Sequence, residues 1–379
     1  MYICVERINM ATVIANGRIF TGENVIEGQH ILVNEGKIIG IVNESPADMN
    51  VIDLGGQNIA PGFIDIQING GREKYFSHTP DAETLTDIYH TCCEYATLHI
   101  LPTLISSPLE VILKAIDTVR EFRKSCPGVL GIHIEGPFFN STKRGAHHPA
   151  IIRKPTNEEL EIIISHGKDV IKVMTIAPEI FSDDQIDMLL ESGIVLSAGH
   201  SEMTYDQAQY YFDKGIHLVT HLYNAMTQMG HRECGTVGAV FDNEQVFAPL
   251  ILDGGHCHYA AARVAYRQKK DRLFLITDSS FLGRQRVQFD WDGLNIEMVD
   301  GFYRDVSGNL AGAAISMPEA VKNAVDHIGA SLQDAVEMAT SRVARAIKMQ
   351  DQIGFIKPGY PSKFVVFDDR LEIVNNLIL

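Results

Sequence analysis

The central part of the chain alternates short apolar runs with stretches of helical periodicity. Apolar runs typical of buried strands span residues 63–69, 99–105, 129–135, 170–176, 194–199, 217–221, 247–252 and 273–278. Helical spacing predicts helices at 82–98, where Asp81 is placed to act as the N-cap, and at 259–270, 317–329 and 332–348. Alternation of this kind indicates βα units around a parallel sheet. Because eight strands are predicted, we expect an α/β fold with a closed, TIM-like (β/α)8 barrel and not an open doubly wound sheet.

The two ends of the chain have a different pattern. Residues 30–33 and 37–42 are apolar runs on either side of Asn34-Glu35-Gly36, which predicts a hairpin with glycine at a positive φ. Near the C-terminus, Pro358-Gly359 predicts a turn and 364–367 a buried strand. We therefore expect a small β-sandwich domain built from residues 1–60 and 353–379, with a barrel domain at 61–352 inserted between its two parts.

Composition narrows the classes of protein to which the chain can belong. It has 379 residues, of which 45% are hydrophobic, and 32 Lys and Arg against 48 Asp and Glu give a net charge of −16. The chain lacks the basic surface that a nucleic-acid partner requires, and an anionic substrate would need a local cluster of cations. The six cysteines form no C-x-x-C pair, and neither a signal peptide nor a membrane-length apolar run is present. We expect a cytoplasmic protein with no membrane partner.

Ligand-type residues stand at the ends of four predicted strands. They are Glu135, His200, His221 and Asp278. Each one alone is more often a hydrogen-bonded rim residue or a helix cap. However, the C-terminal ends of barrel strands meet at one face, and four such residues there favour a catalytic metal site.

A dication bound by one carboxylate and two imidazoles would bring the pKa of a bound water to ~7. Asp278 would then be ionised and able to accept the proton of that water. This combination predicts metal-assisted hydrolysis of an amide or an ester.

A series of motifs in fixed order extends this interpretation along almost the whole chain. The motifs are APGFIDIQING at 60–70, LPTLI at 101–105, HIEGP at 133–137, KRGAH at 143–147, HLYNAM at 221–226, GHRECG at 230–235, DGGH at 253–256, TD at 277–278 and LAG at 310–312. In these motifs the chain resembles the amidohydrolase superfamily and, within it, the N-acetylglucosamine-6-phosphate deacetylases.

The resemblance implies a role for each matching residue. Glu135, His200 and His221 would hold one divalent metal, most often Zn²⁺ with Fe²⁺ or Mn²⁺ as alternatives, and Asp278 would act first as general base and then as general acid. His147 would polarise the scissile carbonyl. The amino-sugar phosphate would be bound by the remaining matched positions, which are Asn224, the Ala225 backbone, Arg232, His256, Leu310 and Gly312. Arg232 would reach the substrate across a homodimer interface.

The chain departs from the superfamily pattern at two places. Many members have H-x-H on the first strand, where this chain has Gln67-Ile68-Asn69, so we expect one tightly bound metal with Gln67 as a weak or water-mediated contributor. The fourth strand has no lysine near its end, which argues against a carboxylated-lysine binuclear site. After Asp278 the loop at 279–284 contains Phe281 and Arg284, which would reshape the substrate pocket.

Two rival functions remain open from the sequence. One is deacetylation of another N-acylated hexosamine phosphate, such as N-acetylgalactosamine 6-phosphate. The other is a catalytically silent barrel that serves as a binding module.

Overall fold

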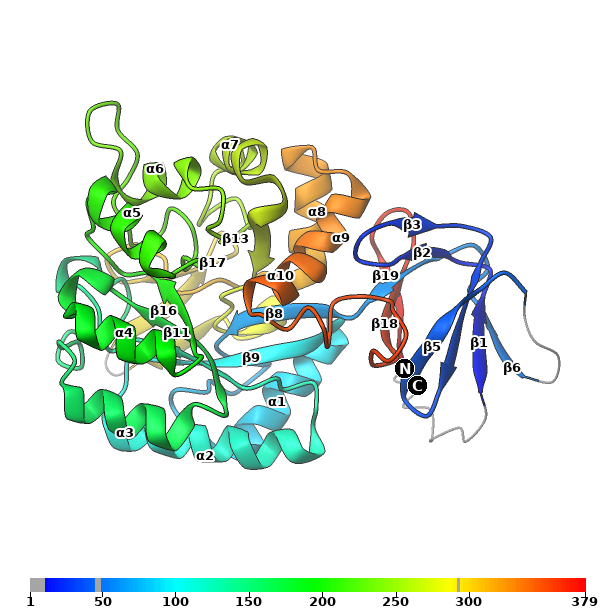
Figure 1. The fold of residues 1–379 in the computed structure, drawn as a ribbon, viewed down its shortest axis with the longest axis horizontal. Coiled ribbons are helices and arrows are strands. Elements are labelled where there is room, and N and C mark those ends of the chain that lie inside the picture. The colour runs from blue at the N-terminus through cyan, green and yellow to red at the C-terminus, as the bar shows by residue number, and fades with distance from the viewer. Residues whose placement is uncertain (1–10, 45–48, 292–293) are drawn as a thin grey trace.

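The central feature of the computed structural model, which describes residues 11–44, 49–291 and 294–379, is a ring of parallel strands (Figure 1). Five strands pair in the order β12-β11-β10-β9-β8, and β13 pairs with β14. Single parallel bridges join the pieces, Ala198 to Val219, Leu218 to Phe247 and Ile68 to Ser279. The predicted TIM-like barrel is therefore confirmed. Its strands are β8 (Phe63–Ile68), β9 (Thr97–Ile105), β10 (Ile132–Glu135), β11 (Ile171–Ile176), β12 (Val195–Ala198), β13 (Ala248–Ile251) and β14 (Leu273–Ile276).

The prediction of a sixth strand at 217–221 is wrong, because these residues do not form a regular strand. In the part of the chain that the structure describes, its β pairing is limited to the isolated bridges of Leu218 and Val219. The backbone turns at His221 and again at Tyr223, where φ is 29° and 77°. Residues with positive φ cannot continue a β ladder, so the run stops after two bridged residues.

Helices cover the outside of the ring (Figure 1). They are α1 (Ala82–Glu94), α2 (Leu109–Ser125), α3 (Asn157–Gly167), α4 (Asp183–Glu191), α5 (Tyr205–Lys214), α6 (Gly235–Asp242), α7 (Tyr259–Lys269), α8 (Met317–Ile328), α9 (Leu332–Met338) and α10 (Ser341–Ala346), with 3-10 turns η1 (Ser141–Lys143), η2 (Pro178–Ile180), η3 (Lys270–Arg272) and η4 (Leu282–Arg284). Among the described residues, none of the helices has both the length and the apolar composition needed to cross a membrane.

Two predicted helices have different limits in the structure. The Asp81 side chain caps α1 by accepting from the Thr84 amide, as expected, but α1 ends before Ala96, whose φ is 59°. The single helix expected at 332–348 is wrong, because Thr340 takes φ −135° and ψ −93° and divides it into α9 and α10.

Two sheets are formed by the ends of the chain. One has the order β5-β4-β1-β6 and the other β19-β18-β7-β2-β3, and β18 pairs with β7 to join the two termini. The predicted hairpin is confirmed, with positive φ at Glu35 and Gly36. The strands are β1 (Thr12–Ala15), β2 (Arg18–Phe20), β3 (Val25–Ile26), β4 (His30–Asn34), β5 (Lys37–Val42), β6 (Asn50–Asp53), β7 (Asn58–Pro61), β18 (Lys363–Phe367) and β19 (Ile373–Ile378). Buried side chains from both sheets, among them Ile31 and Phe364, form one apolar cluster apart from the barrel core.

A third sheet follows β14 in the chain. It contains β15 (Gln288–Trp291), β16 (Leu294–Val299) and β17 (Phe302–Asp305), paired antiparallel. Phe289, Ile296 and Tyr303 belong to a small apolar cluster with Tyr75 and Phe281. This insertion therefore packs against the loops that follow the first and eighth barrel strands.

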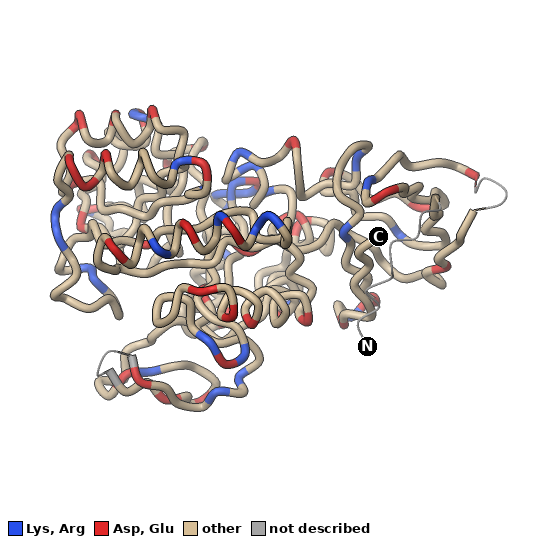
Figure 2. The backbone as a smooth tube through the Cα atoms, turned by 90° about the horizontal axis from the view of Figure 1, so that it is seen from below, with Lys and Arg blue, Asp and Glu red and all other residues tan. Residues whose placement is uncertain are grey.

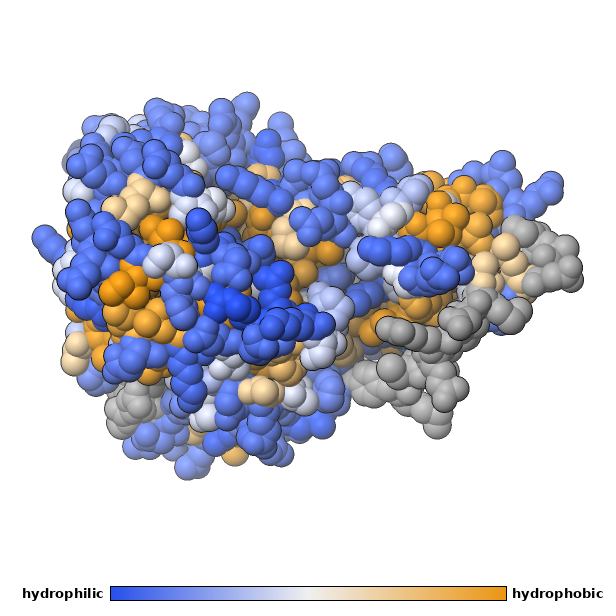
Figure 3. All heavy atoms as spheres, turned by 60° about the horizontal axis from the view of Figure 1, so that its bottom comes forward, coloured by the Kyte–Doolittle hydropathy of each residue, from blue (hydrophilic) through white to orange (hydrophobic). Residues whose placement is uncertain are grey.

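The surface is mixed in charge. Figure 2 shows acidic and basic residues interspersed along the outer helices and not separated into one basic face. Apolar surface is visible at the end of the molecule that holds the terminal sheets (Figure 3), where Ile39 and Val51 are about half exposed, at 49% and 51%.

Candidate active site

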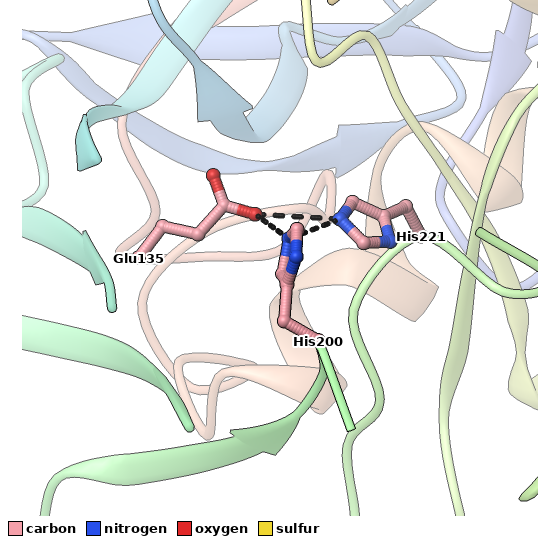
Figure 4. A group of neighbouring side chains, drawn as sticks. All are labelled: Glu135, His200 and His221. Atoms are coloured by element: carbon pink, nitrogen blue, oxygen red, sulfur yellow. Dashed lines mark hydrogen bonds and ion pairs between the residues drawn. The ribbon is translucent and has the colours of Figure 1, made fainter. Parts of the chain in front are cut away.

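Three ligand-type side chains converge at the C-terminal end of the barrel (Figure 4). Glu135 Oε1 lies 3.3 Å from His200 Nε2 and 3.4 Å from His221 Nε2, and the two imidazole nitrogens lie 3.1 Å apart. Glu135 is the last residue of β10, while His200 and His221 follow barrel strands with φ of 50° and 29°. Such backbone is costly for residues other than glycine, and here it turns both imidazoles inward.

The ligand atoms of Glu135, His200 and His221 have the chemistry expected for binding a dication. His200 Nδ1 lies 2.9 Å from the Lys143 carbonyl oxygen and so donates to it, which directs the Nε2 lone pair at Glu135 and His221. Lone pairs that converge on one point are stabilised by a cation between them. A carboxylate with two imidazoles is a donor set typical of catalytic zinc.

The protonation states agree with this fit. Burial tends to raise the pKa of Glu135, but its close contacts with the His200 and His221 imidazoles outweigh burial and hold that pKa well below its usual range. Burial likewise tends to lower the pKa of His221, yet the hydrogen bond and charge of Glu135 raise it above the usual value. Two nearby carboxylates thus favour positive charge at His221, and a dication would replace that proton.

Asp278 adjoins the three donors. Its Oδ1 accepts hydrogen bonds from Asn69 Nδ2 at 2.8 Å and from Gln67 Nε2 at 3.2 Å. The same Gln67 amide nitrogen donates to Glu135 Oε1 at 2.9 Å. Gln67 therefore links the two carboxylates, and its expected part in metal binding stays a prediction. Burial, and then the charge of Glu135, raise the pKa of Asp278 to about 6.

His147 is held in one tautomer. Its Nδ1 accepts from the Ser106 backbone amide at 3.3 Å and lies 2.9 Å from Ser106 Oγ. Burial, and then the charge of His200, lower the pKa of His147 to about 3, so the ring is neutral. Because a backbone N–H can only donate, the ring proton lies on Nε2, where it is available as a hydrogen-bond donor.

A cavity of about 200 Å³, here named the strand-end cavity, brings most of the predicted site residues together. Its lining includes ten of them, which are Glu135, His147, His200, His221, Asn224, Ala225, His256, Asp278, Leu310 and Gly312. His256 is oriented by Asp253, whose Oδ2 lies 2.7 Å from His256 Nδ1. Arg232 does not line this cavity and belongs to an exposed loop at 228–233.

Sequence reasoning missed other residues of the lining, which are Asn69, Tyr75, Ile105, Gly145, Ala146, Ile251, Ser280 and Ala311. Most of them stand in segments that directly follow barrel strands, so the rule that βα loops build barrel sites is the signal that would have found them.

One wall of the cavity is apolar. Tyr75, Ile105 and Ala311 line the cavity and also belong to the cluster that contains Phe281. The Phe281 ring packs behind Tyr75, with ring centroids 5.9 Å apart. Arg284 is turned away and pairs with Glu319 at 2.6 Å. Of the two residues expected to reshape the pocket, Phe281 therefore supports its wall and Arg284 does not line it.

Comparison with known proteins decides the family. The model of the amidohydrolase family matches residues 58–378. The chain belongs to the amidohydrolase family. This amidohydrolase has the candidate metal site that a metal-dependent family requires, in Glu135, His200 and His221.

Relatives of this amidohydrolase include two kinds of deacetylase. The chain is 33% identical to N-acetylglucosamine-6-phosphate deacetylase of Haemophilus influenzae, covering 97% of this chain and 98% of the relative. It is 35% identical to N-acetylgalactosamine-6-phosphate deacetylase of Shewanella sp., covering 95% and 93%. The crystal structure of N-acetylglucosamine-6-phosphate deacetylase from Pasteurella multocida superposes with a TM-score of 0.93 at 32% identity, covering 97% and 98%.

Proposed function

We propose that this amidohydrolase removes the N-acetyl group of N-acetylglucosamine 6-phosphate, giving glucosamine 6-phosphate and acetate in amino-sugar catabolism. The observation on which this rests is that Asp278, the proton-bearing nitrogen of His147 and the donor set of Glu135, His200 and His221 share one cavity. The Haemophilus and Pasteurella deacetylases resemble the chain over nearly its full length.

In the proposed reaction, each protein group has one task. A metal held by Glu135, His200 and His221 would supply Lewis acidity toward water and the carbonyl oxygen. His147 donates its Nε2 proton in a hydrogen bond to that oxygen, which stabilises the negative charge that develops there. Asp278 takes a proton from the attacking water and returns it to the leaving nitrogen. Gln67 and Asn69 hold Asp278 in place by donating to its Oδ1.

The two walls of the strand-end cavity would separate the two ends of the substrate. The wall with Tyr75, Ile105 and Ala311 is apolar and suits the acetyl methyl group. The wall with Asn224 and His256 is polar and suits the sugar phosphate, with Leu310 and Gly312 beside the sugar.

Arg232 would complete the phosphate site from the other subunit of a homodimer. Its exposed position outside the cavity of its own chain supports this arrangement. An acidic protein needs such a local cation to hold a dianion.

Further features of the proposal follow from the donor set and the topology. We infer one divalent metal per chain, with zinc favoured by the two imidazoles and one carboxylate. All cysteines of the described residues are free thiols, which supports a reducing, cytoplasmic location. The pairing of β7 with β18 supports a small β-sandwich domain made of residues 1–60 and 353–379, beside a barrel domain of 61–352.

The Shewanella relative favours a second candidate substrate, N-acetylgalactosamine 6-phosphate. The loop at 279–284, with Phe281 behind the apolar wall, is the part of this chain that departs from the usual deacetylase pattern. Rates of acetate release from the two 6-phosphates, measured on one preparation, separate the candidates.

The test of the reaction itself is acetate release from a panel of N-acetylhexosamines with and without the 6-phosphate, using enzyme of measured metal content. We expect turnover of the phosphorylated sugars and a large loss of kcat/KM without the phosphate. Absence of turnover on every phosphorylated sugar in the metal-replete enzyme would reject the deacetylase proposal.

A further inference from the structure

A second cavity lies at the opposite end of the barrel, between the barrel and the terminal sheets. Its volume is about 730 Å³. The barrel contributes His99 near the start of β9 and residues 127–130 before β10, and the terminal sheets contribute Lys37 of β5 and Lys363 of β18. Figure 1 shows these strands on the two sides of the junction. We name it the basic cavity.

The charged groups of this lining are mostly cationic. Lys37, Arg123 and Lys363 line the basic cavity, and its acidic groups are the Asp351 side chain and the carboxylate of Leu379, the last residue of the chain in this structure. Within residues 11–44, 49–291 and 294–379, none of the three cations forms an ion pair with a carboxylate. Arg123 Nη1 donates to the backbone carbonyl of Asp169 at 3.2 Å, and its charge is one of the causes that lower the pKa of the Asp169 carboxyl, after the hydrogen bond of Arg120.

Lys363 is the most deeply placed of these cations. Its Nζ has a long contact of 3.4 Å with Tyr89 Oη, and its neighbours include the uncharged thiols Cys93 and Cys126. Burial lowers the pKa of Lys363, the direction expected for an ammonium group that is removed from water. A buried cation without a partner is destabilising unless something else compensates its charge.

His99 is a second group in the lining whose hydrogen-bonding capacity is unused. Its side chain is 5% exposed, and its buried Nδ1 has no hydrogen-bond partner in the part of the chain that the structure describes. Burial, and then the charge of Lys363, lower the pKa of His99 to about 3. The ring is therefore neutral and lies beside the charge of Lys363.

We propose that the basic cavity is a binding site for a small phosphorylated metabolite, separate from the strand-end cavity. The three cations offer charge-assisted hydrogen bonds of the kind that phosphate oxygens accept. The volume of the basic cavity lies within the range of small-molecule pockets, ~300–1,000 Å³, so it has room for more than an inorganic ion. The ligand would bridge the barrel and the terminal sheets, because Arg123 belongs to α2 and the two lysines to β5 and β18.

The test is titration calorimetry on the full-length, metal-loaded protein with two probes, inorganic phosphate and glucose 6-phosphate. The test variant is Lys363→Met, which keeps the length of the side chain and removes its charge. The matched control is Lys114→Met, an exposed lysine of α2 outside the cavity. We expect Lys363→Met to weaken one binding event by about tenfold or more for both probes, and Lys114→Met to leave it unchanged.

Each outcome decides the proposal. Binding that is equal in the wild type and in Lys363→Met would place the anion elsewhere, for instance in the strand-end cavity, and overturn it. Absence of a lysine-dependent event for either probe would also overturn it. Binding of inorganic phosphate but not of glucose 6-phosphate would reject a metabolite site. If Lys363→Met fails to fold, Arg123→Gln at the same cavity replaces it, with the same expected loss. Acetate release is measured in parallel, so failure of the deacetylase proposal is recognised independently.

Discussion

The two ends of the barrel differ in whether their buried charged groups have partners. At the strand-end cavity, the Glu135 carboxylate lies against the His200 and His221 imidazoles, and the carboxylates of Glu135 and Asp278 accept from the Gln67 and Asn69 amides. At the basic cavity, Lys363 has no carboxylate partner and His99 has an unpaired nitrogen within the described residues. The first site holds its charges in fixed positions, and the second leaves its charges uncompensated.

This difference indicates which kind of ion each cavity would bind. At the strand-end cavity, the ligand atoms of Glu135, His200 and His221 converge on one point. A single small dication there would compensate their negative charge and lone pairs. The basic cavity is larger, about 730 Å³ against about 200 Å³, and its charge calls for an anion. Fixed geometry suits bond making, because groups that are already oriented need no reorganisation during the reaction.

The largest effect is expected from removal of the metal. Prolonged chelation should lower turnover by about 10³-fold or more, because a Lewis acid contributes several kcal/mol at ~1.4 kcal/mol per decade of rate. Activity should return when one equivalent of Zn²⁺ per chain is added. Acetate release together with metal analysis measures both. A requirement for two equivalents would contradict the single site expected from Gln67 in place of a histidine.

Asp278→Asn is expected to reduce kcat by about 10²–10⁴-fold, the usual contribution of a general base. Metal content and substrate affinity should be little changed, because the amide keeps the size of the side chain. Single-turnover kinetics and metal analysis test this variant. Turnover at the wild-type rate would reject Asp278 as the general base. The fixed charges of the strand-end cavity would then have no assigned role in proton transfer.

Arg232→Ala is expected to raise KM for the phosphorylated substrate by about 10–100-fold, the loss of a charge-assisted hydrogen bond. The rate on the sugar without phosphate should hardly change. Mixing Arg232→Ala chains with Asp278→Asn chains provides a sharper result. Heterodimers would contain one site with both groups and regain activity only if Arg232 acts across the interface, whereas an arginine acting in its own chain predicts no recovery.

A smaller effect is expected at the apolar wall. Phe281→Leu should loosen the support of Tyr75 and increase the ratio of N-propionyl to N-acetyl turnover by a few-fold, since Phe281 packs against Tyr75 at 5.9 Å. Competition kinetics with the two acyl substrates measure that ratio. Arg284→Leu is the matched control, because Arg284 pairs with Glu319 outside the cavity. Equal ratios in both variants would show that this wall does not select the acyl group.

The smallest effect concerns stability at the basic cavity. Because burial lowers the pKa of Lys363 in the folded state, the unfolded chain binds more protons between that pKa and ~10.4. The free energy of unfolding should therefore rise with pH through this window in buffer without phosphate. Lys363→Met should flatten part of the rise. Lys269→Met is needed as a reference, because burial also lowers the pKa of Lys269, to about 8. An unchanged slope in Lys363→Met would mean that Lys363 is compensated.

The sequence predicted most barrel strands because apolar runs alternate with helical segments, and this pattern is local. The predictions for 217–221 and 332–348 were wrong because the backbone turns at His221 and at Thr340. Hydrophobic periodicity contains no information on a single unusual dihedral angle. Glu135, His200, His221 and Asp278 were found because strand ends meet at one face. Tyr75 and Ile105 were missed because nothing in a lone tyrosine or isoleucine indicates a cavity wall.

The chain by itself determined which residue types are available and which end of the barrel they occupy, since both depend on neighbours in sequence. Tertiary structure decided which of them touch. Gln67 contacts Asp278 across 211 positions, and His99 lines a cavity with Lys363 from the other end of the chain. Closure of the barrel and docking of the terminal sheets create these contacts. A charge is then compensated or left unpaired according to what packing places beside it, which no local pattern specifies.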